Sequence, residues 1–292
     1  MHIDSILAVS DFTALSAHAL ERAALLARQH QAPLRLVHFA EGPTTRLAHP
    51  LARLAQRARQ LARRHEIEVH ALEASASLDE VLAEAGASSL LVMGPLSRRS
   101  WRRFHLGTTL DQAVHGSRCP LLVVRRAALR PYAQVLVAVD LSPRSTSLIH
   151  FARQLSAPAG PKLFHAIDTI EDARLRSVNA SPDVIWANRS ASRQQARVRL
   201  TQLIDGLAVP LPAPQGHPLA FDVGHGDPAH ATALHQQATR AELVVVGQRR
   251  RSPLSRFLSG SVAQHLARCS NGDVLIAPLD SLGVLTPANA SC

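Results

Sequence analysis

Two stretches of the chain decide its fold: ILAVSDFT at residues 6–13 and VLVAVDLS at residues 135–142. Each is an apolar run that ends in an aspartate, followed by one residue and then a hydroxyl side chain. Four further pairs of similar segments follow in the same order, so the chain contains an internal repeat. These pairs are LRLVHF at 34–39 and LFHA at 163–166, LLVMG at 90–94 and LVVVG at 243–247, GT at 107–108 and GS at 260–261, and PLLVVR at 120–125 and DVLIAP at 273–278.

The repeated apolar runs are short and rich in valine, leucine and isoleucine, as strands buried on both faces of a sheet are. Segments with helical spacing of apolar residues lie between them, as at Leu54, Ala58 and Leu61. Thr13 and Ser142 are predicted helix N-caps, the latter followed by Pro143. Strands alternating with helices predict an α/β fold whose parallel sheet is covered on both sides. The predicted strands are 4–10, 34–39, 66–73, 89–94, 120–125, 134–140, 162–167, 219–223, 242–247 and 273–278.

The length of 292 residues suits two domains. We place them at 1–127 and 133–280, joined by a linker at 128–132 and followed by a tail at 281–292. Equivalent residues lie 127 apart at the second pair of segments and 153 apart at the third, so the second half carries about 26 more residues. Within this insertion we predict a helix at about 184–207 and a surface loop at 208–218.

The composition argues against membrane-spanning, secreted, disulfide-rich and zinc-binding classes of protein. Hydrophobic residues make up 46% of the chain, yet no run of about 18 uncharged apolar residues could span a membrane. The first residues lack the basic and apolar regions of a secretory signal. The three cysteines are widely spaced and form neither a disulfide framework nor a zinc cluster. We therefore expect a cytoplasmic protein that has no membrane partner.

The charge has two interpretations. Basic residues number 32 against 22 acidic ones, and all but Lys162 are arginine. This is typical of a GC-rich genome, and equally of a surface that attracts phosphates or nucleic acid. Two basic segments fit the second interpretation, although each could be a solvated loop. They contain Arg98, Arg99, Trp101, Arg102 and Arg103 in the first half, and Arg249, Arg250, Arg251 and Arg256 in the second.

The ends of the first and fourth strands of each half carry the residues best suited to bind a ligand. Ligands of doubly wound sheets lie outside the carboxyl ends of the strands. Glycines there let backbone N–H groups approach a phosphate, and a helix that begins with Gly-Thr or Gly-Ser adds its positive end. Asp11 and Asp140 could accept hydrogen bonds from a ribose or a base amine. The structural alternative is that the glycines form tight turns and the aspartates cap helices.

Together these motifs resemble the universal stress protein family, in two tandem copies that cover nearly the whole chain. The resemblance implies two three-layer α/β/α domains, each with a five-stranded parallel sheet in the order 3-2-1-4-5. It also implies that members with a complete glycine motif, Gly-x2-Gly-x9-Gly-Ser/Thr, bind ATP. Here Ser97 and Arg250 replace the second glycine of that motif. The Gly-x-Pro element survives only in the second half, at residues 226–228.

The resemblance assigns nucleotide-binding residues by position. In the second half they are Ala138, Asp140, Ala166, Val246, Gly247, Arg250, Gly260, Ser261 and Val262. In the first half they are Asp11, Phe39, Met93, Gly94, Ser97, Gly107, Thr108 and Thr109. We favour the second half, because it keeps the Gly-Ser pair and the Gly-x-Pro element.

We therefore expect a stress-response protein without catalytic activity that binds ATP in one half. The alternative is a basic RNA- or phosphate-binding accessory module whose nucleotide sites do not function. A hydrolase is the least supported of the three functions, because neither a Walker-type lysine nor a Gly-x-Ser-x-Gly motif is present. His230 and His235 have the wrong spacing for a zinc site on one helix face, so no metal is expected. His38 and His165 are interpreted as core histidines.

The resemblance also suggests how the halves assemble. Domains of this family commonly pair through their fifth strands, so we expect 120–125 and 273–278 to lie antiparallel across a pseudo-twofold axis. Both segments would otherwise be exposed sheet edges. A further homodimer of the whole chain is compatible with this arrangement.

Overall fold

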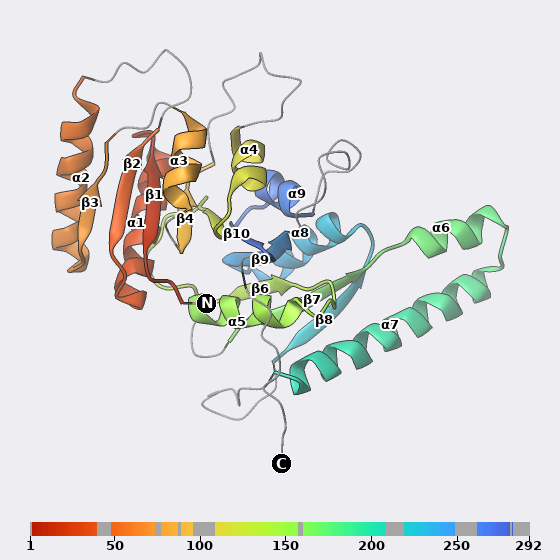
Figure 1. The fold of residues 1–292 in the computed structure, drawn as a ribbon. Helices are drawn as coiled ribbons and strands as arrows, with labels where there is room; N and C mark the ends of the chain where they lie inside the picture. Colours follow the sequence, from red (N-terminus) through yellow and green to blue (C-terminus); the bar gives the residue numbers. More distant parts are fainter. Residues whose placement is uncertain are drawn as a thin grey trace.

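The computed structural model describes residues 2–39, 48–73, 77–86, 89–95, 109–156, 160–207, 219–248, 262–280 and 282. Strands and helices alternate along both halves of this part of the chain (Figure 1). The first half contains β1 (Ile6–Ser10), α1 (Ala14–His30), β2 (Leu34–His38), α2 (Pro50–His65), β3 (Val69–Ala71), α3 (Leu78–Ala85), β4 (Leu90–Met93), α4 (Thr109–Gly116) and β5 (Leu121–Val123). The second half contains β6 (Val135–Ala138), α5 (Ser145–Leu155), β7 (Lys162–Ile167), α6 (Ile170–Ser177), α7 (Pro182–Asp205), β8 (Phe221–His225), α8 (Pro228–Thr239), β9 (Leu243–Gln248), α9 (Val262–Cys269) and β10 (Asp273–Pro278).

All ten strands form one sheet in the order β3-β2-β1-β4-β5-β10-β9-β6-β7-β8. Within each half the neighbouring strands are parallel, and both halves have the predicted order 3-2-1-4-5. The halves meet where β5 and β10 pair antiparallel, with Leu122 opposite Leu275. The predicted pairing of 120–125 with 273–278 is therefore confirmed.

Three layers follow from the alternation of side chains along the buried strands. In β1, Ile6 and Ala8 belong to one buried apolar cluster, whereas Leu7 and Val9 belong to another. The first cluster packs against α1, α2, α5 and α7, and the second against α3, α4, α8 and α9. Helices thus cover both faces of the sheet, and the α/β prediction is confirmed.

The two predicted helix starts had different outcomes. Thr13 caps α1 as predicted, because its Oγ1 accepts a hydrogen bond of 3.2 Å from the Ser16 N–H. Ser142 does not cap α5, which begins three residues later with Arg144 at the N-cap position. The Ser142 carbonyl accepts a hydrogen bond of 2.9 Å from the Ser145 N–H, so a separate turn precedes the helix.

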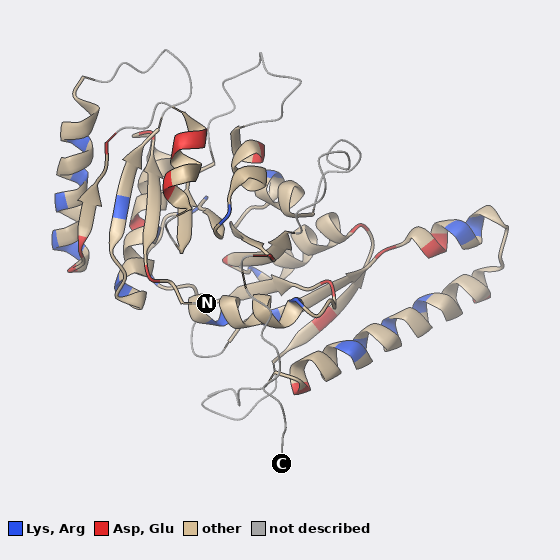
Figure 2. Cartoon of the chain, in the orientation of Figure 1, with Lys and Arg blue, Asp and Glu red and all other residues tan. Residues whose placement is uncertain are grey.

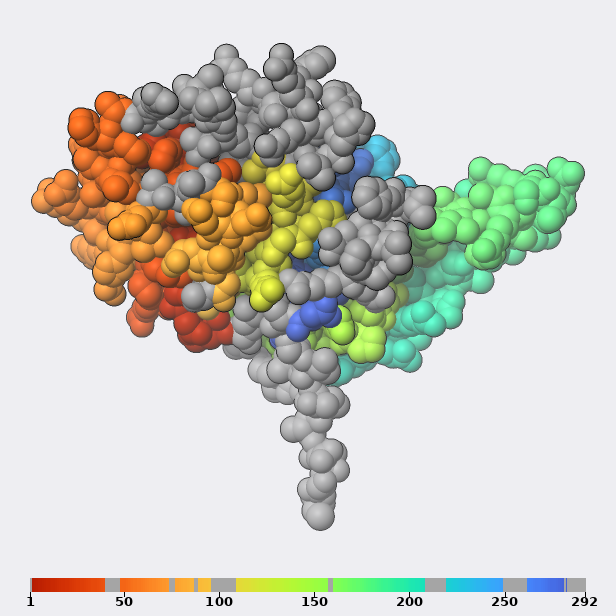
Figure 3. Space-filling model, turned by 45° about the horizontal axis from the view of Figure 1, so that its top comes forward, coloured from red at the N-terminus to blue at the C-terminus, as the bar shows by residue number. Residues whose placement is uncertain are grey.

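The insertion in the second half contains two helices where the sequence predicted one. α7 matches the predicted helix closely, but α6 was missed, because its eight residues bury little besides Asp172 and carry no apolar periodicity. The hairpin of α6 and α7 projects from the body of the molecule beside β8 (Figures 1 and 3). The predicted loop at 208–218 lies outside the described residues.

A buried polar cluster joins the two halves at the linker. The carboxylate of Asp273, which is 1% exposed, accepts a hydrogen bond of 2.6 Å from the Tyr132 hydroxyl and one of 2.8 Å from the Arg125 N–H. The guanidinium of Arg22 lies 3.7 Å from the centre of the Tyr132 ring, and its Nε forms an ion pair with Asp273. Burial, and next the Asp273 charge, raises the pKa of Tyr132 well above its ordinary value. Tyr132 therefore anchors the end of the linker in the core, whereas Leu129, Arg130 and Pro131 before it are exposed.

The pseudo-twofold axis is also visible in contacts between α4 and α9. Arg268 binds the carboxylate of Asp111 through two nitrogens, at 2.8 and 2.5 Å. In the repeat Gln264 is equivalent to Asp111, and His115 is equivalent to Arg268. The side chains of Gln264 and His115 form a hydrogen bond with each other. Each helix thus presents the same two positions to the other, as expected for a symmetric interface.

Candidate functional site

The two aspartates of the repeat, Asp11 and Asp140, lie in equivalent turns at the carboxyl ends of their strands. Asp11 accepts hydrogen bonds from the N–H and hydroxyl of Thr13, at 2.9 and 2.6 Å. Asp140 accepts from the Ser142 N–H and the Ser145 hydroxyl, both at 3.0 Å. The residue after each aspartate has a positive φ, 58° at Phe12 and 57° at Leu141. Such backbone is uncommon outside glycine, and its recurrence shows that the repeat fixes this turn.

The histidines at the ends of β2 and β7 brace the same turns. Nδ1 of His38 donates to the Ser10 carbonyl at 2.8 Å, and Nδ1 of His165 donates to the Val139 carbonyl at 2.8 Å. A carbonyl only accepts, so each ring must carry its proton on this nitrogen. Both histidines therefore tie the second strand to the first, in keeping with the interpretation as core residues.

The two halves differ in the side chains that line the carboxyl edge of the sheet. In the second half three small residues, Ala138, Ala166 and Gly247, lie at or one residue before the ends of neighbouring strands, and all three are partly exposed. Ala138 lies opposite Val246, another predicted site residue. The equivalent residues of the first half, Val9, Phe39 and Gly94, are all buried. Hence these positions are partly exposed at the second edge and buried at the first, where one of them is a phenylalanine.

The glycines at the two strand ends, Gly94 and Gly247, differ in the atoms that a side chain at each position would meet. A Cβ on Gly94 would lie 3.2 Å from the carbonyl oxygen of Leu15, so this glycine lets β4 approach the first turn of α1. A Cβ on Gly247 would lie 2.7 Å from the side chain of Leu279. Close backbone packing thus explains the glycine of the first half, while Gly247 faces a flexible side chain.

Charged groups that the motif search missed lie beside both turns. In the second half Arg144 forms an ion pair with Asp280, which follows β10. In the first half the guanidinium of Arg53 lies 5.9 Å from the centre of the Phe12 ring. Neither contact had a sequence signal, because the partners are far apart in the chain and unlike in the two halves.

The Gly-x-Pro element of the second half has a clear structural role. Gly226 has φ +132°, a conformation that favours glycine, and Asp227 caps α8 by accepting from the His230 N–H at 2.8 Å. In the first half Ser77 caps α3 in the same way, accepting from the Glu80 N–H at 3.2 Å. The loss of the element there is therefore compensated as far as helix capping is concerned.

Several predicted residues fall outside the described part of the chain. They are Ser97, Trp101, Gly107, Thr108, Arg250, Gly260 and Ser261. The helices that follow these segments begin at Thr109 and Val262. Met93, like Val246, is buried.

The histidines of α8 make contacts within the fold. His235 stacks on Phe164 with ring centres 4.3 Å apart, and its Nε2 lies 3.2 Å from Asp222. Burial lowers its pKa, although the Asp222 charge opposes this. In the described part of the chain no three His, Cys, Asp or Glu side chains lie together as metal ligands would. Nor does any described helix combine the length and apolar character that crossing a membrane requires.

Comparison with known proteins places these features in a family. The model of the universal stress protein family matches residues 2–125 and 131–278. A universal stress protein of Mycobacterium tuberculosis is 27% identical over 197 residues, which span 65% of this chain and 62% of that protein. The match thus covers less than two thirds of this curated relative.

Solved structures show the same fold over nearly the whole chain. A protein of unknown function from Pseudomonas aeruginosa PAO1 has a TM-score of 0.64 and 21% identity, covering 96% of this chain and 94% of that one. A universal stress protein from Archaeoglobus fulgidus has a TM-score of 0.59 and 16% identity, covering 94% and 96%. At such identities the likeness concerns the fold alone.

Proposed function

This chain belongs to the universal stress protein family, and we propose from that premise that it is a non-catalytic stress-response protein that binds ATP in its second half. The Asp140 carboxylate would accept hydrogen bonds from the ribose hydroxyls. The sheet edge formed by Ala138, Ala166 and Gly247 would lie against the nucleoside. The segment from Arg250 to Ser261 would hold the phosphates. The cytoplasmic location expected from the sequence stays a prediction.

The observation that carries the choice of half is the contrast between Ala166 and Phe39. Both residues follow the bracing histidine at the end of the second strand of their half. Ala166 is partly exposed, whereas Phe39 is 6% exposed and its ring belongs to the core. A planar base needs a partly apolar surface that is free to receive it, and this surface exists beside Ala166.

The electrostatics beside Asp140 also suit a nucleotide. Arg144 begins α5 directly after the turn, and its charge is shared with Asp280. An arriving phosphate could replace that carboxylate as the partner of the guanidinium, since arginine binds both groups in the same geometry. The helix that follows the phosphate-binding segment, α9, would add its positive end.

Titration calorimetry with ATP tests the proposal. Asp140→Ala should weaken binding by ~1–3 kcal/mol, the effect of losing hydrogen bonds to a charged group. Asp11→Ala removes the equivalent carboxylate of the first half and is the matched control, for which we expect little change. Equal losses, or a larger loss from Asp11→Ala, would contradict the choice of half. Absence of ATP binding by the parent protein would refute the proposal.

A second candidate function rests on α2. This helix has basic residues along its length and no acidic one (Figure 2). Its exposed arginines are Arg53, Arg59, Arg63 and Arg64. Such a surface would bind phosphates of RNA without requiring the nucleotide site. RNA binding should weaken steeply as salt rises, whereas ATP held at the strand ends should depend less on salt. Arg59→Glu together with Arg63→Glu should abolish the former and spare the latter.

A further inference from the structure

The chain that follows β10 crosses the carboxyl end of β9. Leu279 extends the ladder between these two strands, since its N–H donates to the Gln248 carbonyl at 3.0 Å. Its side chain is 6% exposed and lies on Gly247, where a Cβ would be 2.7 Å from the nearest leucine carbon. We call residues 279–280 the strap. Its first side chain thus covers one of the glycines of the candidate site.

The second residue of the strap reaches the turn at the end of β6. The carboxylate of Asp280 forms an ion pair with the guanidinium of Arg144, and these side chains are 43% and 41% exposed. Arg144 occupies the N-cap position of α5, just after the turn that Asp140 forms. In the sheet β9 lies between β10 and β6. The strap therefore runs from the end of β10, past the end of β9, to the start of α5.

The strap belongs to the second half alone among the described residues. In the repeat the residue equivalent to Leu279 is Arg126. Its N–H donates to Asp273 at 3.2 Å, and its Nε donates to the Asn271 carbonyl at 2.9 Å, so it binds at the junction of the halves. The residue equivalent to Asp280 is Ala127, which carries no charge. The first half thus has neither the apolar cover nor the ion pair.

The strap also changes how the strand end meets the following helix. In the first half the Leu15 carbonyl oxygen of α1 would lie 3.2 Å from a Cβ on Gly94, so the helix itself covers that glycine. The residue equivalent to Leu15 is Arg144. On Gly247 the nearest atoms are instead those of Leu279. A side chain from the end of the second half therefore replaces a permanent contact between strand and helix, and such a cover can leave.

We propose that the strap is autoinhibitory: it closes over the nucleotide site of the second half, and ATP opens it. This inference rests on the proposed function. A phosphate that pairs with Arg144 displaces Asp280, because arginine binds both groups through the same N–H groups. The phosphates then repel the freed carboxylate, so the strap leaves and Gly247 is uncovered for the nucleoside.

The closed form is weak enough for a ligand to reverse it. An ion pair as exposed as that of Asp280 contributes little stability, so the burial of Leu279 is the other main contact that keeps the strap closed. A site that is open for about a tenth of the time binds about tenfold more weakly than one that is always open. Closure thus lowers the affinity for any ligand that needs the strand ends.

Titration calorimetry with ATP and with adenosine tests the proposal. Asp280→Ala removes the ion pair and should bind both ligands about five- to tenfold more tightly than the parent chain. Asp205→Ala removes the same charge from an exposed side chain at the end of α7 and is the matched control, which should bind as the parent does. Thermal unfolding establishes that both variants are folded.

Adenosine separates closure from simple repulsion, because it carries no phosphate. If Asp280→Ala tightened the binding of ATP and left that of adenosine unchanged, the carboxylate would act only by repelling phosphates, and closure would be overturned. Weaker binding of ATP by Asp280→Ala would overturn it as well.

Arg144→Ala has opposite effects on the two ligands. The substitution frees the strap and also removes the partner of the phosphates. Adenosine should therefore bind several-fold more tightly, whereas ATP should bind more weakly than to the parent chain. Weaker binding of both ligands would show that Arg144 supports the site without closing it, which contradicts the proposal.

Hydrogen exchange follows the strap directly. The Leu279 N–H is hydrogen-bonded in the closed form, so it should exchange faster when ATP saturates the parent chain. The amides of β10 are the reference and should keep their protection. An unchanged rate at Leu279 in a chain that binds ATP would refute the strap and leave the proposed function intact. Absence of ATP binding by both the parent and Asp280→Ala would refute the two together.

Discussion

The two halves of the chain share a backbone and differ in what they place on it. Both have the aspartate turn, the residue of positive φ after it, and the bracing histidine. Yet the strand end beside the histidine is a buried phenylalanine in one half and a partly exposed alanine in the other. The comparison teaches that a repeated motif can preserve a turn while the strand end beside it is buried in one copy and partly exposed in the other.

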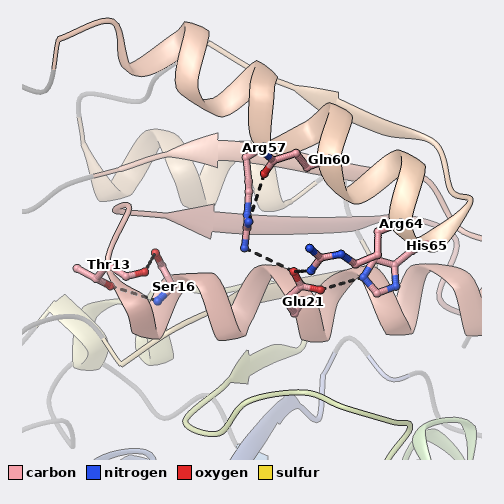
Figure 4. Close-up of polar contacts among 7 residues, drawn as sticks. All are labelled: Thr13, Ser16, Glu21, Arg57, Gln60, Arg64 and His65. Atoms are coloured by element: carbon pink, nitrogen blue, oxygen red, sulfur yellow. Dashed lines mark hydrogen bonds and ion pairs between the residues drawn. The ribbon is translucent and has the colours of Figure 1, made fainter.

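The helix after the second strand differs as well. In the first half Glu21 of α1 anchors α2, since its carboxylate meets Arg64 at 2.7 Å and His65 at 2.9 Å (Figure 4). Arg57 approaches the same carboxylate at 3.5 Å. In the second half the position equivalent to Glu21 is His150, and the insertion supplies a longer helix, α7. Both outer helices pack on the core, α2 through Leu54, Ala58 and Leu61 and α7 through Leu200, and the contacts of Glu21 add a polar anchor for α2.

Loss of the junction cluster should have the largest effect. Asp273 stands where the first half has Pro120, so one carboxylate serves the contact between halves. Asp273→Ala would leave the Tyr132 hydroxyl and the Arg125 N–H buried without their acceptor. We expect a loss of about 3–5 kcal/mol in the free energy of unfolding, measured with urea.

Tyr132→Phe is the graded comparison for this cluster, because it removes the hydroxyl and keeps the ring under Arg22. We expect it to cost less than Asp273→Ala. Asp4→Ala, at an exposed side chain, is the control and should have little effect. If Asp273→Ala were as mild as Asp4→Ala, the cluster would not join the halves energetically.

The contrast at the strand ends can be abolished by one substitution. Ala166→Phe gives the second edge the residue of the first and should weaken ATP binding about a hundredfold, or about 2.8 kcal/mol. Calorimetry measures the loss, and thermal unfolding establishes that the variant is folded. Phe39→Leu alters the first edge conservatively and should leave ATP binding unchanged. A reversed result would assign the nucleotide to the first half.

The anchoring of α2 can be tested on its own. Glu21→Gln keeps the shape of the side chain but removes the charge that Arg64 and His65 share. Because the carboxylate is 19% exposed, we expect a modest loss of about 1 kcal/mol in urea unfolding. His150→Gln at the equivalent position should cost less. An unchanged stability of Glu21→Gln would show that apolar packing alone holds α2.

Acidification should destabilise the second half more than the first, and this is the smallest of the expected effects. Burial lowers the pKa of His150, His225 and His235 in the second half, and of His30 in the first. The unfolded chain then binds protons first as pH falls through the ordinary histidine pKa, so stability present above that pH is lost below it. We expect a lower unfolding temperature at about pH 5.5 than at about pH 7.5.

His235→Phe tests this linkage, because a phenylalanine can keep the stacking on Phe164 without titrating. The variant should show a smaller change between the two pH values than the parent chain does. His230→Phe, at an exposed histidine of the same helix, is the control and should leave the change as it was. An identical pH dependence in all three proteins would contradict the proposed origin of the effect.

The sequence by itself determined the repeat, the class of fold and most of the strands. Apolar runs such as Leu90–Met93 are buried on both faces and have no other stable place, so their pattern is unambiguous. The aspartate turn and the cap at Thr13 are likewise local, because both involve residues within a few positions of each other. Such local interactions can be predicted from the spacing of residues in the sequence.

Only the tertiary structure determined the burial and the long-range contacts that residue spacing in the sequence does not reveal. The burial of Phe39 against the exposure of Ala166, and the meeting of Arg22, Tyr132 and Asp273, depend on segments that lie far apart in the chain. The helix α6 was missed for a related reason, since it has little apolar face of its own and its Asp172 is buried by Arg189 of α7. Side chains at strand ends and junctions take their environment from elsewhere in the fold, and that environment decides how far each of them is exposed.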